Sequence, residues 1–224
     1  MIFRFSRLDG PRAVSLVWKS ADGAGPSETV VTEEEPSTLS TPASASPDGM
    51  VLLYNRVTPI SADVRIVPLR GERQPQPYLQ TAFSQGAAQL SPDGRWVAYV
   101  SNEFGRYEIY VRSFSNAQMK WQISEGGGVE PVWARNGQEL FYRAGDRSLA
   151  VDITTYPAFH AGKPKVLFKG QFSRGSTAVG AAGYDVSLDG QRFLMVKPVG
   201  QAEATHINVV QNWFEELERL VPAN

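Results

Sequence analysis

Short apolar strands and tight turns alternate along the whole chain. In residues 95–101 (RWVAYVS) and 107–114 (YEIYVRSF), most side chains are apolar or aromatic, and β-branched residues recur. Such segments are typical of β-strands with buried faces. They are bounded by glycine, proline, asparagine and aspartate, which favour turns. The pattern therefore predicts an all-β protein.

One turn motif occurs four times, and its glycines are 45, 43 and 53 residues apart. The first two intervals match a repeat length of β-propellers. The copies are residues 46–49 (SPDG), 91–94 (SPDG), 134–137 (ARNG) and 187–190 (SLDG). Proline presets the backbone for the turn, aspartate or asparagine tolerates the third position, and glycine takes the positive φ that closes the hairpin. We therefore expect the four glycines to occupy equivalent hairpin turns.

Each turn lies between a small-residue strand and an apolar strand. A large side chain stands at the same place after each turn: Tyr54, Tyr99, Tyr142 and Met195. A second strand follows each of these, and in most repeats a shorter third strand follows it. Four antiparallel strands per repeat are the organisation of a propeller blade. The strand before each turn is rich in alanine, serine and glycine, which fits the crowded innermost position.

The repeat predicts a single all-β propeller domain spanning residues 1–224. It has about five blades of four-stranded antiparallel sheets, with the first and last blades incomplete. The predicted blades are residues 1–35, 36–80, 81–124, 125–170 and 171–213. Helical spacing of apolar residues predicts a short C-terminal helix over residues 212–221. Residues 172–183 (FSRGSTAVGAAG) break the period and are predicted to form a mobile surface loop.

Composition excludes several classes of function. The net charge is −1 and the charges are dispersed, so there is no basic surface of the kind that binds nucleic acid. The chain has no cysteine, which excludes disulfides, thiolate nucleophiles and cysteine-based zinc sites. No apolar run approaches the ~20 residues of a membrane-spanning helix, and we expect no membrane insertion.

The sequence resembles the TolB-like, WD-like β-propeller repeats of bacteria. More closely, it is similar to the C-terminal propeller of some bacterial serine/threonine protein kinases. The segments that carry the resemblance are SPDGRWVAYVSNEFGRYEIYVRSF, GGGVEPVWARNG, YDVSLDGQRFLMVKP and NWFEELERLVP. The similarity extends over essentially the whole chain. No glycine-rich kinase loop, HRD or DFG motif is present, so the kinase domain is absent.

The resemblance implies a sensor or scaffold propeller separated from its catalytic domain. In such kinases a membrane helix often precedes the propeller and places it outside the cytoplasm. The sequence contains neither such a helix nor a signal-peptide pattern. The compartment therefore stays open.

Polar residues on the innermost strands are the candidates for ligand binding. Gln89, Glu130, Tyr184 and Asp185 lie there, and two of them are acidic residues from adjacent blades. Two carboxylates together with amide oxygens can hold Ca²⁺ or another hard divalent metal. In the alternative interpretation, Glu130 and Asp185 only cap turns or face solvent.

The leading functional hypothesis is a non-catalytic module that binds a protein, peptide or small molecule and requires no cofactor. The alternative is a promiscuous metal-dependent hydrolase of esters or phosphotriesters, with Glu130 and Asp185 holding the metal in the axial channel. No Gly-x-Ser-x-Gly motif occurs. His160 and His206 are expected at the surface and at a strand edge. A third hypothesis is a fragment without independent function.

The incomplete terminal blades also predict self-association. A blade that lacks a strand exposes unpaired backbone groups and an apolar flank. Two copies can cover these surfaces most simply around a two-fold axis. We therefore expect a homodimer in which terminal blades meet, with a compact five-bladed monomer as the alternative.

Overall fold

The computed structural model describes residues 6–9, 13–20, 22–33, 35, 37–116, 118–175 and 177–198. Regular structure in these residues is entirely β, with no helix. The helix expected over residues 212–221 lies outside the described residues, as do His206 and the strand expected around it.

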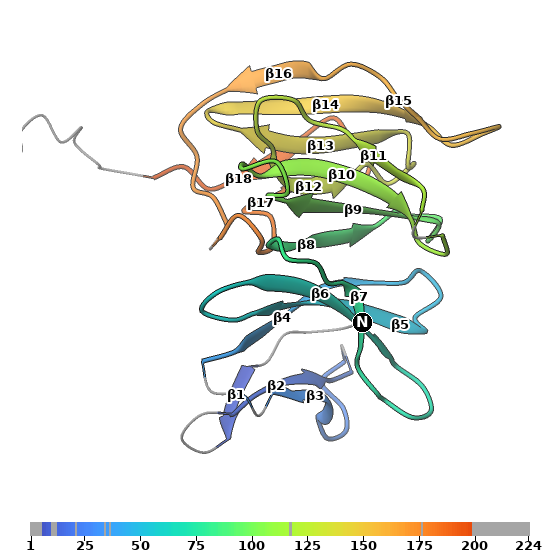
Figure 1. Ribbon diagram of the computed structural model, residues 1–224, viewed down its shortest axis with the longest axis vertical. Helices are drawn as coiled ribbons and strands as arrows, with labels where there is room; N and C mark the ends of the chain where they lie inside the picture. Colours follow the sequence, from blue (N-terminus) through green and yellow to red (C-terminus); the bar gives the residue numbers. More distant parts are fainter. Residues whose placement is uncertain are drawn as a thin grey trace, which may run out of the picture.

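Five antiparallel sheets follow one another along the chain (Figure 1). Sheet one contains β1 (Ser6–Asp9), β2 (Ala13–Trp18) and β3 (Glu28–Glu33). Sheet two contains β4 (Leu39–Ala45), β5 (Val51–Val57), β6 (Ala62–Pro68) and β7 (Gln76–Leu79). Sheet three contains β8 (Gln85–Leu90), β9 (Trp96–Ser101), β10 (Glu108–Ser113) and β11 (Lys120–Gln122).

Sheets four and five complete the described structure. Sheet four contains β12 (Val129–Trp133), β13 (Glu139–Ala144), β14 (Arg147–Thr154), β15 (His160–Ala161) and β16 (Lys165–Lys169). Sheet five contains β17 (Tyr184–Val186) and β18 (Phe193–Met195). Within each sheet, strands that are consecutive in sequence pair with each other, except that β15 and β16 both pair with β14. This meander is the strand order of a propeller blade.

Sheets one to four are arranged in sequence order. Sheets one and four lie toward opposite ends of the long axis, with sheets two and three between them (Figure 1). The first strands of neighbouring sheets contact each other, β4 with β8 and β8 with β12. These strands are therefore the innermost ones. The predicted all-β architecture with four-stranded antiparallel sheets is confirmed.

The hydrophobic core consists of clusters between neighbouring sheets. Leu140 of sheet four packs with Trp96 and Ile109 of sheet three, and all three are buried. The large side chain that follows each repeated turn belongs to these clusters in sheets two to four. These residues are Tyr54, Tyr99 and Tyr142, and each is at most 2% exposed. The stability of each sheet therefore depends on its neighbour.

The four predicted turns have the same geometry. Gly49, Gly94, Gly137 and Gly190 have φ angles of 67°, 70°, 71° and 72°. In every turn the glycine N–H donates to the carbonyl oxygen of the first turn residue, at 2.8–2.9 Å. Their predicted equivalence is confirmed.

A valine at Gly94 is expected to lower the free energy of unfolding by about 1–3 kcal/mol, because a β-branched residue resists positive φ. A Cβ atom there would also lie 3.2 Å from Cδ of Pro47, whereas nothing lies within 4 Å of one at Gly49. Gly49→Val is therefore the control that isolates the backbone strain. Thermal unfolding followed by circular dichroism gives the melting temperatures of both valine variants. An unchanged melting temperature for Gly94→Val would contradict the turn assignment.

The segment between β16 and β17 differs from the expected surface loop. Its Val179 is buried, and the carbonyl oxygen of Val179 accepts a hydrogen bond from Ala87 N at 2.8 Å. A Cβ atom on Gly86 would lie 2.5 Å from that same oxygen, so glycine permits the close approach. The described part of the segment therefore returns to the innermost strand of sheet three.

Candidate functional site

A cavity of about 410 Å³ lies where the inner strands of sheets two to five meet. Two structurally equivalent positions of each strand contribute to its lining. The first is occupied by Ser44, Gln89, Val132 and Asp185, and the second by Ala45, Leu90, Trp133 and Val186. The repeated turns add Pro47, Ser91, Pro92, Arg135 and Ser187. The cavity is therefore axial and lies at the ends of the inner strands that lead into the repeated turns.

Polar groups of both signs line this axial cavity. Asp185 and Arg135 are exposed, and the Asp185 carboxylate accepts a hydrogen bond from its neighbour Val186 N at 2.8 Å. Among the described residues, the side-chain amide of Gln89 makes one long hydrogen bond, at 3.5 Å to the carbonyl oxygen of Ala43. These three side chains can therefore form hydrogen bonds with an incoming ligand.

The walls of the cavity are fixed by contacts between neighbouring inner strands. The indole N–H of Trp133 donates to the carbonyl oxygen of Gln89 at 3.0 Å. The backbone N–H of Leu90 donates to the Ser44 hydroxyl at 3.1 Å. A preformed wall lowers the entropic cost of binding.

A β-bulge precedes the lining residue in three of the inner strands. The pairing register shifts between Pro42 and Ser44, between Gly86 and Gln89, and between Val129 and Val132. A bulge re-aims the side chains that follow it. These bulges therefore determine which inner-strand residues reach the cavity.

Glu130 lies beside the cavity and does not line it. It is 1% exposed, and its carboxylate accepts hydrogen bonds from the backbone N–H groups of Gly175 and Gly183. Arg143 forms an ion pair with the same carboxylate, and its Nη1 lies 3.4 Å from Oε2 of Glu130. The guanidinium also donates to the carbonyl oxygens of Phe172 and Ser173, at 3.0 and 2.8 Å. This buried pair therefore attaches the segment between β16 and β17 to sheet four.

Tyr184 belongs to the same buried network. Its hydroxyl donates to the backbone carbonyl oxygen of Glu130 at 2.9 Å. Burial, with a further contribution from the charge of Glu130, raises the pKa of Tyr184 well above its ordinary value. The hydroxyl therefore stays protonated and serves as a structural donor.

The structure thus places Gln89 and Asp185 in the cavity, and Glu130 and Tyr184 in the network next to it. Among the described residues, no group of three or more His, Asp or Glu side chains is arranged to hold a metal ion. A metal bound by Glu130 and Asp185 stays a prediction. Arg135 and Ser187 were not identified from sequence, although both lie in the repeated turns that directly follow the inner strands.

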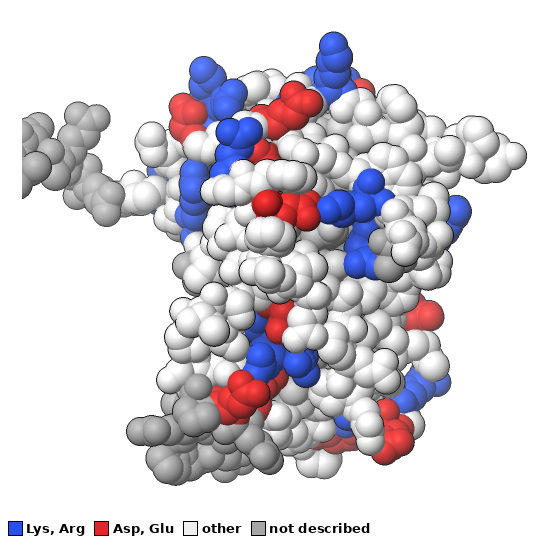
Figure 2. All heavy atoms as spheres, in the orientation of Figure 1, with Lys and Arg blue, Asp and Glu red and all other residues white. Residues whose placement is uncertain are grey.

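Charges on the surface are mixed in sign. Figure 2 shows lysine, arginine, aspartate and glutamate interspersed on the visible face, without a large area of one sign. In the part of the chain that the structure describes, no helix is long and apolar enough to span a membrane.

Solved structures with a similar fold include TolB from Acinetobacter baumannii, at 20% identity and a TM-score of 0.58. The matched region covers 84% of this chain and 44% of TolB. Prolyl oligopeptidase B from Galerina marginata matches at 13% identity and a TM-score of 0.55, over 86% of this chain and 32% of that protein.

A puromycin-hydrolyzing peptidase from Mycobacterium tuberculosis matches at 18% identity and a TM-score of 0.53. That match covers 85% of this chain and 34% of the peptidase. The chain therefore spans less than half the length of each of these proteins. No family model and no curated protein matches the sequence. The TolB-like resemblance is confirmed at the level of the fold, and the kinase-linked resemblance stays a prediction.

Proposed function

We propose that this TolB-like propeller is a binding module that holds a segment of a partner protein or peptide in its axial cavity. The observation that carries the proposal is the convergence of four inner strands on one cavity of about 410 Å³. Concave sites with a few well-placed polar groups are the usual form of binding sites in proteins.

The chemistry of the cavity favours a peptide as its occupant. A peptide backbone needs both donors and acceptors, and the cavity offers the amide of Gln89, the carboxylate of Asp185 and the guanidinium of Arg135. Val132 and Trp133 add apolar surface for a side chain. A small polar molecule is the other ligand class that these groups fit.

The hydrolase alternative requires a metal shared by Glu130 and Asp185. The carboxylate of Glu130 already has Arg143 and two backbone N–H groups as partners. A metal there would have to displace a buried guanidinium, which is costly. This arrangement supports the binding module over the hydrolase. Kinase attachment and homodimerisation stay predictions, and the compartment stays open.

Selection from a random peptide library displayed on phage tests the proposal. We expect the enriched peptides to lose about tenfold or more in affinity for a Gln89→Trp and Asp185→Arg double variant, because the cavity is then filled and its charge reversed. Gln74→Trp with Glu125→Arg is the matched control, since it changes the net charge by the same amount, both residues are exposed and neither lines the cavity. Equal binding to all three proteins would show that the axial cavity is not the site.

The same preparation distinguishes the hydrolase alternative. Stoichiometric metal in the purified protein, together with chelator-sensitive hydrolysis of activated esters or phosphotriesters, would favour that alternative. Loss of this hydrolysis in a Glu130→Gln and Asp185→Asn variant would then assign the metal to these residues.

A further inference from the structure

The segment between β16 and β17 forms a strap that is attached to two neighbouring inner strands. The strap comprises residues 172–175 and 177–183 and has no regular secondary structure. The carbonyl oxygen of its Val179 accepts a hydrogen bond from Ala87 N in β8. Two of its backbone N–H groups donate to the carboxylate of Glu130 in β12. The strap therefore links the innermost strands of sheets three and four.

Both residues that hold the strap have an unusual backbone conformation. Ala87 and Glu130 have φ angles of 50° and 58°, and Ser37 is the only other described non-glycine residue with a positive φ. Ala87 and Glu130 lie at the same distance along the chain ahead of their turn glycines, Gly94 and Gly137. A positive φ is unfavourable for a residue with a Cβ atom and persists only where other contacts hold it. The strap supplies such a contact at both places.

The same two residues lie inside the bulges that aim side chains into the axial cavity. β8 pairs with β9 up to Gly86 and again from Gln89, and Ala87 lies in the gap. β12 likewise resumes its pairing with β13 at Val132, after Glu130. Gln89 and Val132 both line the axial cavity. The strap is therefore attached where the orientation of two lining side chains is decided.

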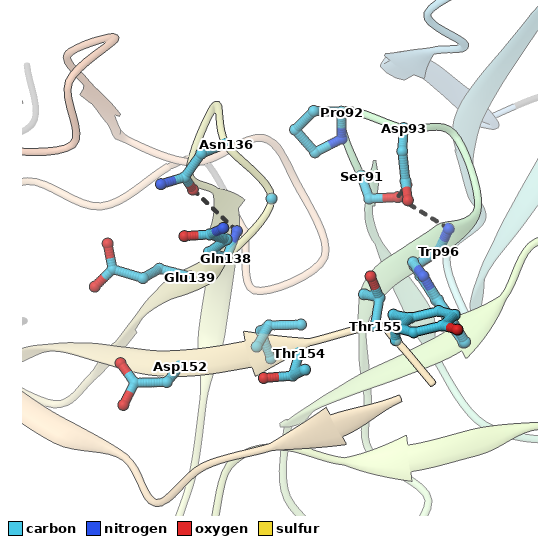
Figure 3. Close-up of a pocket in the computed structure, with 13 residues that line it drawn as sticks. Ser91, Pro92, Asp93, Trp96, Asn136, Gln138, Glu139, Asp152, Thr154 and Thr155 are labelled. Carbon is cyan, nitrogen blue, oxygen red and sulfur yellow. Dashed lines mark hydrogen bonds between the residues drawn. The ribbon is translucent and has the colours of Figure 1, made fainter. Parts of the chain in front are cut away.

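The other ends of these two strands are held by the repeated turns themselves. The backbone N–H of Trp96 donates to the Ser91 hydroxyl, and that of Gln138 donates to the Asn136 side chain, both at 2.9 Å (Figure 3). These contacts are local in sequence and do not involve the strap. Release of the strap would therefore free the bulges and leave the turns intact.

We propose that the strap controls the shape of the axial cavity. When the strap is docked, the bulges hold Gln89 and Val132 in place for a ligand, and when it is released, the bulges relax and the cavity loses its shape. The indole N–H of Trp133 donates to the carbonyl oxygen of Gln89, so the two bulged strands change together. The inference rests on the proposed binding function, because it concerns regulation of the same cavity. Coupling between two sites is reciprocal, so a ligand in the cavity also favours the docked strap.

Alanine at Gly86 displaces the strap without changing the lining of the cavity. Its Cβ atom would lie 2.5 Å from the carbonyl oxygen of Val179, and Gly86 does not line the cavity. β8 is held by its pairing with β9, so the strap moves. Val179→Gly is a second variant, which removes a buried side chain and introduces no clash. Gly162→Ala is the control, because the nearest atoms to its Cβ would be at an ordinary 3.5 Å.

Hydrogen exchange of the Trp133 indole N–H, followed by NMR, reports the state of the cavity without any ligand. We expect this exchange to be at least about tenfold faster in Gly86→Ala, about threefold faster in Val179→Gly and unchanged in Gly162→Ala. The backbone amide of Val64, a buried residue of sheet two, is the reference for global unfolding. The proposal is wrong if Trp133 exchange is unchanged in both strap variants, or if it rises only as much as that of Val64.

Fluorescence anisotropy of the labelled peptides selected against the axial cavity measures the coupling to a ligand. We expect Gly86→Ala to bind them about tenfold more weakly, and saturating peptide to slow exchange of the Ala87 amide in the unmodified protein by about the same factor. Equal affinity of the unmodified protein and both strap variants would overturn the proposal. If selection yields no peptide that depends on Gln89 and Asp185, the proposed binding function fails, and Trp133 exchange still decides whether the strap controls the cavity.

Discussion

Replacing Arg143 with methionine is expected to lower the free energy of unfolding by about 3–5 kcal/mol, because it leaves a buried carboxylate without its cation. Arg143 and Glu130 side chains are only 3% and 2% exposed, so water cannot compensate. The carbonyl oxygens of Phe172 and Ser173 lose their donors in the same step. Urea unfolding followed by tryptophan fluorescence measures the loss.

The double variant Arg143→Met with Glu130→Gln is the control for this interpretation. Removing the second charge as well should recover about 1–2 kcal/mol relative to the single variant, since residues in one network do not contribute additively. A single variant that unfolds at the urea concentration of the unmodified protein would mean that the pair is not buried as described. A double variant less stable than the single one would mean that the charge is not the cause.

Truncation of Leu140 to alanine should cost about 2–5 kcal/mol of unfolding free energy, the usual range for a fully buried leucine. Leu140 has no exposed surface and lies in the cluster that joins sheets three and four. Two effects contribute to this loss of unfolding free energy. The removed methyl groups no longer gain free energy by transfer out of water, and a cavity remains in the core. Urea unfolding at neutral pH is again the measurement.

Leu194→Ala is the matched control, because Leu194 is also on a strand but is 76% exposed. We expect this change to stay within about 0.5 kcal/mol of the unmodified protein. If the two alanine substitutions lower the free energy of unfolding equally, the contact between sheets three and four contributes less to stability than the structure indicates.

The repeat made much of the fold predictable from the sequence. The hairpin turns depend on local chemistry, since Pro47, Asp48 and Gly49 specify their conformation without help from distant residues. The small residues of β4 and β8 likewise marked the inner strands. These features repeat in phase, so each copy supported the assignment of the others.

The candidate site was less predictable because strand alternation fails at the bulges. Regular alternation would place Glu130 and Val132 on the same face of β12. Glu130 instead has a φ of 58°, and the register shifts between Val129 and Val132. Val132 therefore lines the cavity, whereas Glu130 is buried with Arg143. A glutamate in a strand of otherwise apolar residues was the available signal.

The segment between β16 and β17 could not be placed from sequence for a different reason. Its attachment depends on Gly86, Ala87 and Glu130, which are far from it along the chain. Glycine and alanine in the segment indicated only that it was irregular. Its partners are visible only when β8, β12 and the segment are brought together in three dimensions.

The contacts between successive turns have a consequence for how such a chain can lengthen. A Cβ atom on Gly94 would approach Pro47, and one on Gly137 would approach Pro92 at 3.7 Å, so these two glycines lie against the proline of the turn before them. The two junctions therefore use the same pair of surfaces, one from each neighbour. A duplicated copy of the corresponding gene segment would therefore fit between two existing copies without any new complementary surface. Insertion of a whole unit should be tolerated in evolution far more readily than insertion of half of one.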